Sequence, residues 1–177
     1  MTIRFAYADD AEPLSALAAE TFPLACPPTL PPSDIRRFIT EHLSPARFTE
    51  HLTNETRTLL LTERDDRITG YALLRNEPPA ADVAAMLPQG HVVELNKFFL
   101  RSDEHGNGTA TALLDAVTDH AATTGAGYIW LGVSRDNARA NRFYQRHGFS
   151  LVGHKSFTVG GTVLPEDFVR LRTLPAG

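Results

Sequence analysis

The chain has 177 residues, of which 42% are hydrophobic and 21% are charged, and its formal net charge at pH 7 is −4. These values are typical of a soluble globular chain, and we expect one domain over residues 1–177. The chain has no long basic run, so nucleic acid is not an expected partner. It also has no apolar run near the ~20 residues of a membrane span, so we expect no membrane association.

The N-terminal residues have neither the basic nor the apolar region of a secretory signal. Cys26 is the only cysteine in the sequence and therefore cannot form an internal disulfide. A cytoplasmic location is the simplest prediction from these two features.

The first third of the chain predicts a strand followed by helices. Residues 2–6 favour a strand, and a helix is expected to begin at Asp9 and Asp10. Residues 22–34 contain five prolines and predict a loop without helix. Residues 34–52 have helical spacing again, with Pro45 as an interruption that allows two shorter helices.

The middle and the end of the chain predict paired strands. A hairpin is expected from residues 58–62 and 68–74. Residues 76–90 predict a loop with one helical turn near 82–86. The closing strands are expected at 150–158 and 163–172, with Gly160 and Gly161 in the turn between them.

Residues 92–114 predict a strand, a glycine-containing loop and a helix. Gly106 and Gly108 allow backbone N–H groups to turn toward one point at the start of the helix. A helix N-terminus has unpaired donors and a positive dipole end, which suit a phosphate. The alternative is a strand-to-helix turn that needs glycine for its geometry alone.

Residues 129–149 repeat the strand, turn and helix order. Asn137 is a good N-cap, and Gly148 lies where a glycine commonly ends a helix. Within the first stretch, Asn96 and Lys97 interrupt the apolar alternation of the strand over 92–100, which predicts a β-bulge of the kind found beside active sites.

Together, these stretches resemble the two central motifs of the GNAT superfamily of N-acetyltransferases. The first motif, Gln/Arg-x-x-Gly-x-Gly/Ala, matches at Gly108 and Ala110, whereas His105 replaces Gln or Arg and Ser102 replaces a common proline. The second motif, Asn-x-x-Ala-x-x-Phe-Tyr-x-x-x-Gly-Phe, matches at six positions: Asn137, Ala140, Phe143, Tyr144, Gly148 and Phe149. Both motifs stand in the family's order and at its separation.

The resemblance implies an α/β fold. The expected sheet is mixed but mostly antiparallel, with about 6–7 strands and about four flanking helices, in the order β-α-α-β-β-β-α-β-α-β-β. In this fold the fourth and fifth strands splay apart, and acetyl-coenzyme A enters between them. The resemblance implies transfer of the acetyl group to a primary amine by direct attack.

The acceptor is less clear from the sequence. A looser resemblance to bacterial spermidine/spermine acetyltransferases, which includes Asp167 and Arg170, favours a small-molecule amine such as a polyamine. A protein or peptide amine, and a coenzyme-binding regulatory module with little catalysis, stay open. The sequence does not determine the oligomeric state, and a homodimer is compatible with it.

The resemblance also indicates which residues would hold acetyl-coenzyme A. The pyrophosphate is expected at the backbone of the glycine loop, the pantetheine arm along the end of the fourth strand, and further contacts at the second motif. These positions are Phe98, Phe99, Leu100, His105, Gly106, Asn107, Gly108, Thr109, Ala110, Asn137 and Tyr144. Arg139 and Arg142 could meet the 3′-phosphate, although ordinary surface charge explains them as well.

Tyr144 and Glu94 are the candidate catalytic residues. The family places a tyrosine at the position of Tyr144, near the sulfur, where a phenol can act as the general acid. Glu94 interrupts an apolar run and is the candidate base, directly or through water. Alternatively, Tyr144 is a core aromatic, and Glu94 pairs with Lys97 or lies on an exposed strand face.

Two other chemistries are disfavoured. Cys26 lies in a proline-rich stretch without a local His or Asp signature, so we do not expect an acetyl-cysteine intermediate. The histidines show no metal-ligand spacing, and no metal is assigned.

Overall fold

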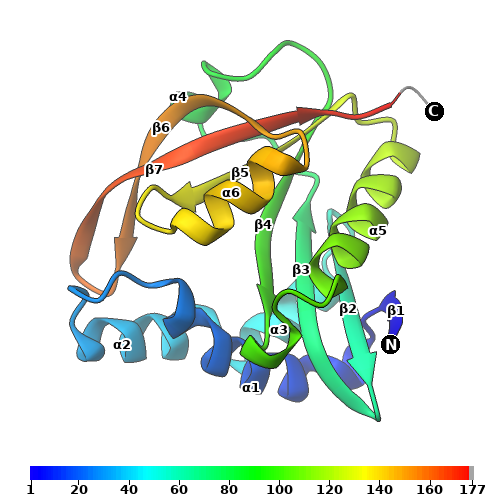
Figure 1. Ribbon diagram of the computed structural model, residues 1–177, viewed down its shortest axis with the longest axis vertical. Coiled ribbons are helices and arrows are strands. Elements are labelled where there is room, and N and C mark those ends of the chain that lie inside the picture. The colour runs from blue at the N-terminus through cyan, green and yellow to red at the C-terminus, as the bar shows by residue number, and fades with distance from the viewer. Residues whose placement is uncertain (176–177) are drawn as a thin grey trace.

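The computed structural model describes residues 1–175, apart from the side chains of residues 165 and 166. Within them, seven strands form one sheet in the order β1-β2-β3-β4-β5-β7-β6 (Figure 1). Neighbouring strands pair antiparallel except β4 and β5, which are parallel. The strands are β1 (Thr2–Phe5), β2 (Arg57–Arg64), β3 (Arg67–Arg75), β4 (Val92–Leu100), β5 (Tyr128–Ser134), β6 (Ser150–Val159) and β7 (Thr162–Thr173).

Six α-helices are found in the described part of the chain, rather than the expected four or so. The difference arises because Pro45 begins a new helix and because one short turn forms before β4. The helices are α1 (Ala11–Thr21), α2 (Pro32–His42), α3 (Pro45–Thr53), α4 (Ala81–Ala84), α5 (Thr109–Thr123) and α6 (Ala138–Arg146). Among these residues, no helix combines the length and the apolar character needed to cross a membrane.

The proline-rich segment contains more helix than its composition predicts. Residues Phe22–Ala25 form a short 3-10 helix, and α2 already begins at Pro32. Proline is compatible with the first turn of a helix, where its missing N–H would have no partner in any case. The expectation that residues 22–34 contain no helix was therefore wrong at both ends.

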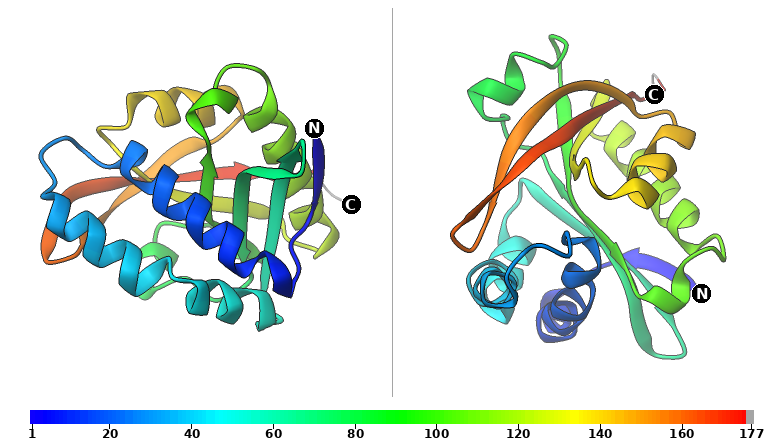
Figure 2. Two further views of the ribbon diagram at one scale, coloured as in Figure 1. Left: turned by 90° about the horizontal axis from the view of Figure 1, so that it is seen from below. Right: turned by 60° about the vertical axis from the view of Figure 1, so that its left-hand side comes forward.

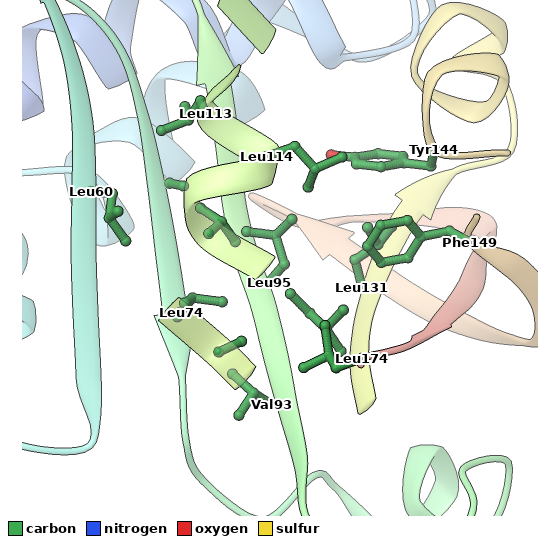
Figure 3. Packing of buried hydrophobic residues seen from close by; sticks show 14 of the residues in the cluster. Leu60, Leu74, Val93, Leu95, Leu113, Leu114, Leu131, Tyr144, Phe149 and Leu174 are labelled. Atoms are coloured by element: carbon green, nitrogen blue, oxygen red, sulfur yellow. The ribbon is translucent and has the colours of Figure 1, made fainter. Parts of the chain in front are cut away.

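Helices cover both faces of the sheet, as Figure 2 shows. Each face of the sheet has its own hydrophobic core, and alternate residues of one strand belong to different cores. In β3, Ala72 and Leu74 pack with α5, whereas Tyr71 and Leu73 pack with α1 and α3. This is the two-residue period of a strand that is buried on both faces. The α5 core continues past β5 to Tyr144 and Phe149 (Figure 3).

Strands β4 and β5 separate after a short region of pairing. Their parallel register is limited to Val92–Glu94 opposite Tyr128–Trp130, and Figure 1 shows the two strands diverging beyond it. Along β4, Leu73 faces Lys97 and Leu74 faces Leu95, so Asn96 is the extra residue of a bulge. The predicted bulge and the expected splay are therefore both present.

Candidate active site

The loop before α5 needs its two glycines. Gly106 and Gly108 have φ values of +84° and +92°, which residues with a side chain rarely adopt. Gly108 is also the N-cap of α5. Apart from the glycine itself, its two chain neighbours and the nearby backbone of the helix, no atom of the described residues lies within 4 Å of the position where a Cβ would stand on either glycine. The backbone of this loop therefore has open space in front of it at the positive end of a 15-residue helix.

Glu104 stabilises this loop through its side-chain hydrogen bonds. Its buried carboxylate accepts hydrogen bonds from Thr109 Oγ1 at 2.6 Å and Asn107 Nδ2 at 2.7 Å, and it pairs with Arg64 Nε at 2.9 Å. The Arg64 guanidinium and these two donors lower the pKa of Glu104 to about 2. The side chains of Asn107 and Thr109 thus form hydrogen bonds within the loop.

A cavity of about 660 Å³, here called the large cavity, is lined by this loop, by the end of β4 and by helix α6. Its volume lies in the range of small-molecule and cofactor sites. Of the expected coenzyme-binding residues, only Asn107 and Thr109 do not line it. The lining residues are Thr21, Leu24, Ala25, Phe98, Phe99, Leu100, His105, Gly106, Gly108, Ala110, Thr111, Asn137, Arg139, Ala140, Phe143, Tyr144, Arg146 and His147.

His105 meets Arg139 at the edge of the large cavity. Arg139 Nη1 lies 2.6 Å from His105 Nδ1, and because a guanidinium can only donate, Nδ1 is the acceptor. Burial and the charge of Arg139 lower the pKa of His105. Arg146 also lines the cavity, whereas Arg142 lines neither cavity described here.

Strand β5 and helix α6 are joined by a buried polar network. Asn137 caps α6 by accepting from Ala140 N at 3.0 Å, as predicted. Asn141 Nδ2 donates to the Ser134 carbonyl at 2.8 Å, and the buried Arg170 donates from Nε to Asn141 Oδ1 at 3.0 Å. This network fixes α6 against the end of β5 and so fixes the cavity wall.

Tyr144 lies on α6 and lines the large cavity. It is 7% exposed and makes edge contacts with the rings of Phe98 and Phe149. Burial raises the pKa of its phenol above the ordinary value of 10. Tyr144 is therefore both a core aromatic and a protonated group beside the cavity.

A second cavity of about 210 Å³, here called the small cavity, adjoins the large one. The two share part of their lining: Ala25, Phe98, Phe99, Asn137, Ala140 and Tyr144. Glu94, Lys97, Lys155 and Asp167 bring charge to the small cavity, and apolar side chains of α2, β6 and β7 complete it.

Glu94 lines the small cavity and pairs with Arg75 instead of Lys97. Its carboxylate accepts from Arg75 Nη1 at 3.3 Å and from Asn96 Nδ2 at 3.0 Å, and the side chain is 13% exposed. Lys97 Nζ donates to Asn96 Oδ1 at 3.1 Å. Burial lowers the pKa of Lys97 to about 8, and the charge of Glu94 opposes this effect.

Several residues of this site were not identified from the sequence. Glu104 is one of them, because its partner Arg64 lies 40 residues away and the pair forms only in the folded chain. Thr21, Leu24 and Ala25 are others, since nothing in their spacing indicates a cavity. The sequence offered one indication of the role of Glu104, which is that an acidic residue stands just before the glycine loop.

Substitution of Glu104 should weaken the fold in a pH-dependent way. A depressed carboxylate pKa stabilises the folded state above the unfolded value of about 4.5, and this contribution is lost as the pH falls toward about 2. Glu104→Gln should therefore lower the Tm at pH 7, and the difference from the wild type should shrink at about pH 3. Thermal denaturation at both pH values measures this.

Asp103→Asn is the matched control, because Asp103 is the exposed neighbour of Glu104 in the same short helix. It should leave the Tm nearly unchanged at either pH. Equal Tm values for the wild type and Glu104→Gln at pH 7 would show that the loop does not depend on this carboxylate.

Comparison with known proteins agrees with this geometry. The model of the acetyltransferase (GNAT) family matches residues 18–149. An uncharacterized N-acetyltransferase of Mycobacterium tuberculosis is 42% identical over 165 residues, which are 93% of this chain and 98% of the relative. Among solved structures, PaiA N-acetyltransferase of Thermoplasma acidophilum in complex with coenzyme A has a TM-score of 0.76 at 18% identity, covering 98% of this chain and 99% of its own.

A Salmonella typhimurium protein solved with its cofactor acetyl-CoA has a TM-score of 0.69 at 18% identity, covering 100% of this chain and 95% of its own. At such identities the two structural likenesses show the fold, and they confirm the expected GNAT architecture. The family model and the mycobacterial relative show more than the fold. The chain belongs to the acetyltransferase (GNAT) family.

Proposed function

We propose that this acetyltransferase transfers the acetyl group of acetyl-coenzyme A to a primary amine of a small molecule. One observation carries the proposal: the large cavity leads from the glycine loop to Tyr144, and there it meets the small cavity. A donor in the first cavity and an amine in the second would meet at their shared wall. Holding both reactants in this way supplies much of the rate of a bimolecular reaction.

Acetyl-coenzyme A fits the large cavity by its chemistry. Its pyrophosphate would lie at the N-terminus of α5, where Gly106 and Gly108 leave the backbone open. Among the described residues, the edge of β4 at Phe98–Leu100 has no strand partner on the β5 side, so its backbone could pair with the pantetheine amides. Arg139 and Arg146 would add positive charge along the same cavity.

The reaction needs a base and an acid. An alkylammonium with a pKa near ~10 has no free electron pair, so it must lose a proton before its nitrogen attacks the thioester carbon. As the C–N bond forms and the C–S bond breaks, the leaving sulfur takes up a proton. We assign the donor role to Tyr144, which burial keeps protonated, and the acceptor role to Glu94, directly or through water.

An acetyl-cysteine intermediate is disfavoured at Cys26. The thiol lines the small cavity, but burial raises its pKa to about 11. A thiol with this pKa is almost entirely protonated at neutral pH and is a weak nucleophile. Direct attack of the amine therefore remains the proposed route.

A coenzyme-release assay tests the function. The purified protein is mixed with acetyl-coenzyme A and a panel of polyamines, amino acids, aminoglycosides and peptides with free N-termini. We expect turnover with at least one small amine and little with peptides. Thermal stabilisation by acetyl-coenzyme A without turnover on any amine would instead support a coenzyme-binding module.

Tyr144→Phe should lower kcat by ~10²–10⁴-fold, the usual contribution of general acid catalysis. The ring and its contacts with Phe98 and Phe149 remain, so the Tm should change little. Steady-state kinetics and thermal denaturation measure the two effects. Tyr128→Phe, which removes a hydroxyl outside both cavities, is the control. An unchanged kcat in Tyr144→Phe would assign the tyrosine to packing alone.

Glu94→Gln should reduce the rate most at low pH, where the amine depends on a base, and high pH should partly restore it. The kcat/KM profile from pH 6 to pH 10 measures this. Glu77→Gln removes the other carboxylate partner of Arg75 and lies outside both cavities, so it controls for loss of the ion pairs. A rate loss that is independent of pH would indicate a structural role for Glu94.

A further inference from the structure

One carboxylate in the small cavity lacks a partner. Asp167 on β7 is 6% exposed and lines the small cavity. Within the described residues, its Oδ1 is buried without a hydrogen-bond partner, and the carboxylate forms no ion pair within 4 Å. Buried carboxylates are normally paired or hydrogen-bonded, because removing the charge from water is costly.

The cation opposite Asp167 lies beside aromatic rings. Lys155 on β6 lies opposite Asp167 in the strand register, and its charge acts against the rise in the Asp167 pKa caused by burial. Its Nζ, however, lies 5.7 Å from the ring centre of Trp130 and 6.0 Å from that of Phe157. Gly132 makes room for this arrangement, because a Cβ there would stand 2.4 Å from Lys155 Cε.

The other charged groups of the small cavity already have partners. Glu94 accepts hydrogen bonds from Arg75 and Asn96, and Lys97 donates to Asn96. Beside these groups the wall is largely apolar, with Phe22, Phe38, Leu43, Phe157 and Leu164. An unpaired carboxylate in an apolar pocket suits a ligand that has an ammonium group on an alkyl chain.

We propose that Asp167 binds an ammonium group of the acceptor, so that the acceptor is an alkylamine held in the small cavity. This inference rests on the proposed function, since it assumes that the small cavity receives the acceptor. Asp167 is here a binding residue that selects and positions the amine, whereas the proton transfer stays with Glu94. The cost of leaving its carboxylate unpaired in the free protein would be recovered when the acceptor binds.

The first test is the stability of the free protein. Burial raises the pKa of Asp167, and a raised carboxylate pKa favours the folded state below the unfolded value and loses that contribution as the pH rises. Asp167→Asn should therefore raise the Tm at pH 7, by about 2–4 °C or more for a chain of this size. The gain should vanish near pH 3, where the carboxyl group is protonated in both states.

Other titratable groups also face the small cavity, namely Glu94 and Lys97 on β4, Tyr144 on α6, Lys155 on β6 and Cys26, while Arg170 lies on the same strand as Asp167. All of them are present in both proteins, so the difference in Tm isolates Asp167. The exposed Asp119→Asn on α5 is the matched control and should show no gain. A lower Tm for Asp167→Asn at pH 7, or failure of this variant to fold, would make Asp167 a structural residue and overturn the proposal.

The second test is ligand binding to the coenzyme A complex. Butylammonium, with n-butanol as the uncharged probe, is titrated against wild type, Asp167→Asn and Asp119→Asn by thermal shift. Butylammonium should stabilise wild type and Asp119→Asn, and its affinity for Asp167→Asn should be about tenfold lower or worse, as for loss of a charged hydrogen bond. Butanol should give the same thermal shift in all three proteins.

The two hypotheses fail in different ways. If coenzyme A stabilises the protein but butylammonium binds wild type and Asp167→Asn equally, or binds neither, the role of Asp167 is overturned and the proposed function stands. If coenzyme A gives no stabilisation, the proposed function itself fails. Kinetics with butylamine as the acceptor add a last criterion. In Asp167→Asn the KM for butylamine should rise while kcat stays nearly constant. A fall in the kcat of this variant that high pH restores would make Asp167 the base instead.

Discussion

The structure depends on one constraint, which is that β4 and β5 pair for only three residues and then separate. Backbone donors and acceptors along the opened edges need other partners, because unpaired groups inside a protein are costly. Strand β5 continues its pairing with β7, whereas the β4 edge beyond its bulge faces the large cavity. On the far side of the large cavity, the Asn141–Arg170 network holds α6 against the end of β5.

Three carboxylates beside this opening differ in their partners and therefore in their chemistry. Glu104 has three partners and fixes the glycine loop. Glu94 has two and lines the small cavity. Asp167 has an Oδ1 without a hydrogen-bond partner among the described residues, and it is the proposed binding site of a charged ligand. The same functional group thus serves as scaffold, candidate base or candidate binding site according to the donors that the fold brings to it.

Much of the fold could be predicted from local patterns. The hairpin, the bulge at Asn96, the cap at Asn137 and the glycine at Gly148 each follow from residues within a few positions of one another. The start of α2 at Pro32 could not, because a proline run indicates a loop unless its last member is seen to begin a helix. The number of helices exceeds the expected four because α3, which begins at Pro45, and the short α4 are separate helices.

The sequence by itself determined the family and the glycine loop, because both depend on residue types at short, fixed spacings. It also identified Tyr144 and Glu94 as candidates, and both line the small cavity. Only the tertiary structure decided which charges meet: Glu104 with Arg64, Glu94 with Arg75 rather than Lys97, and Asp167 with no partner among the described residues. These pairings join segments that are distant in the chain, so no local pattern reveals them.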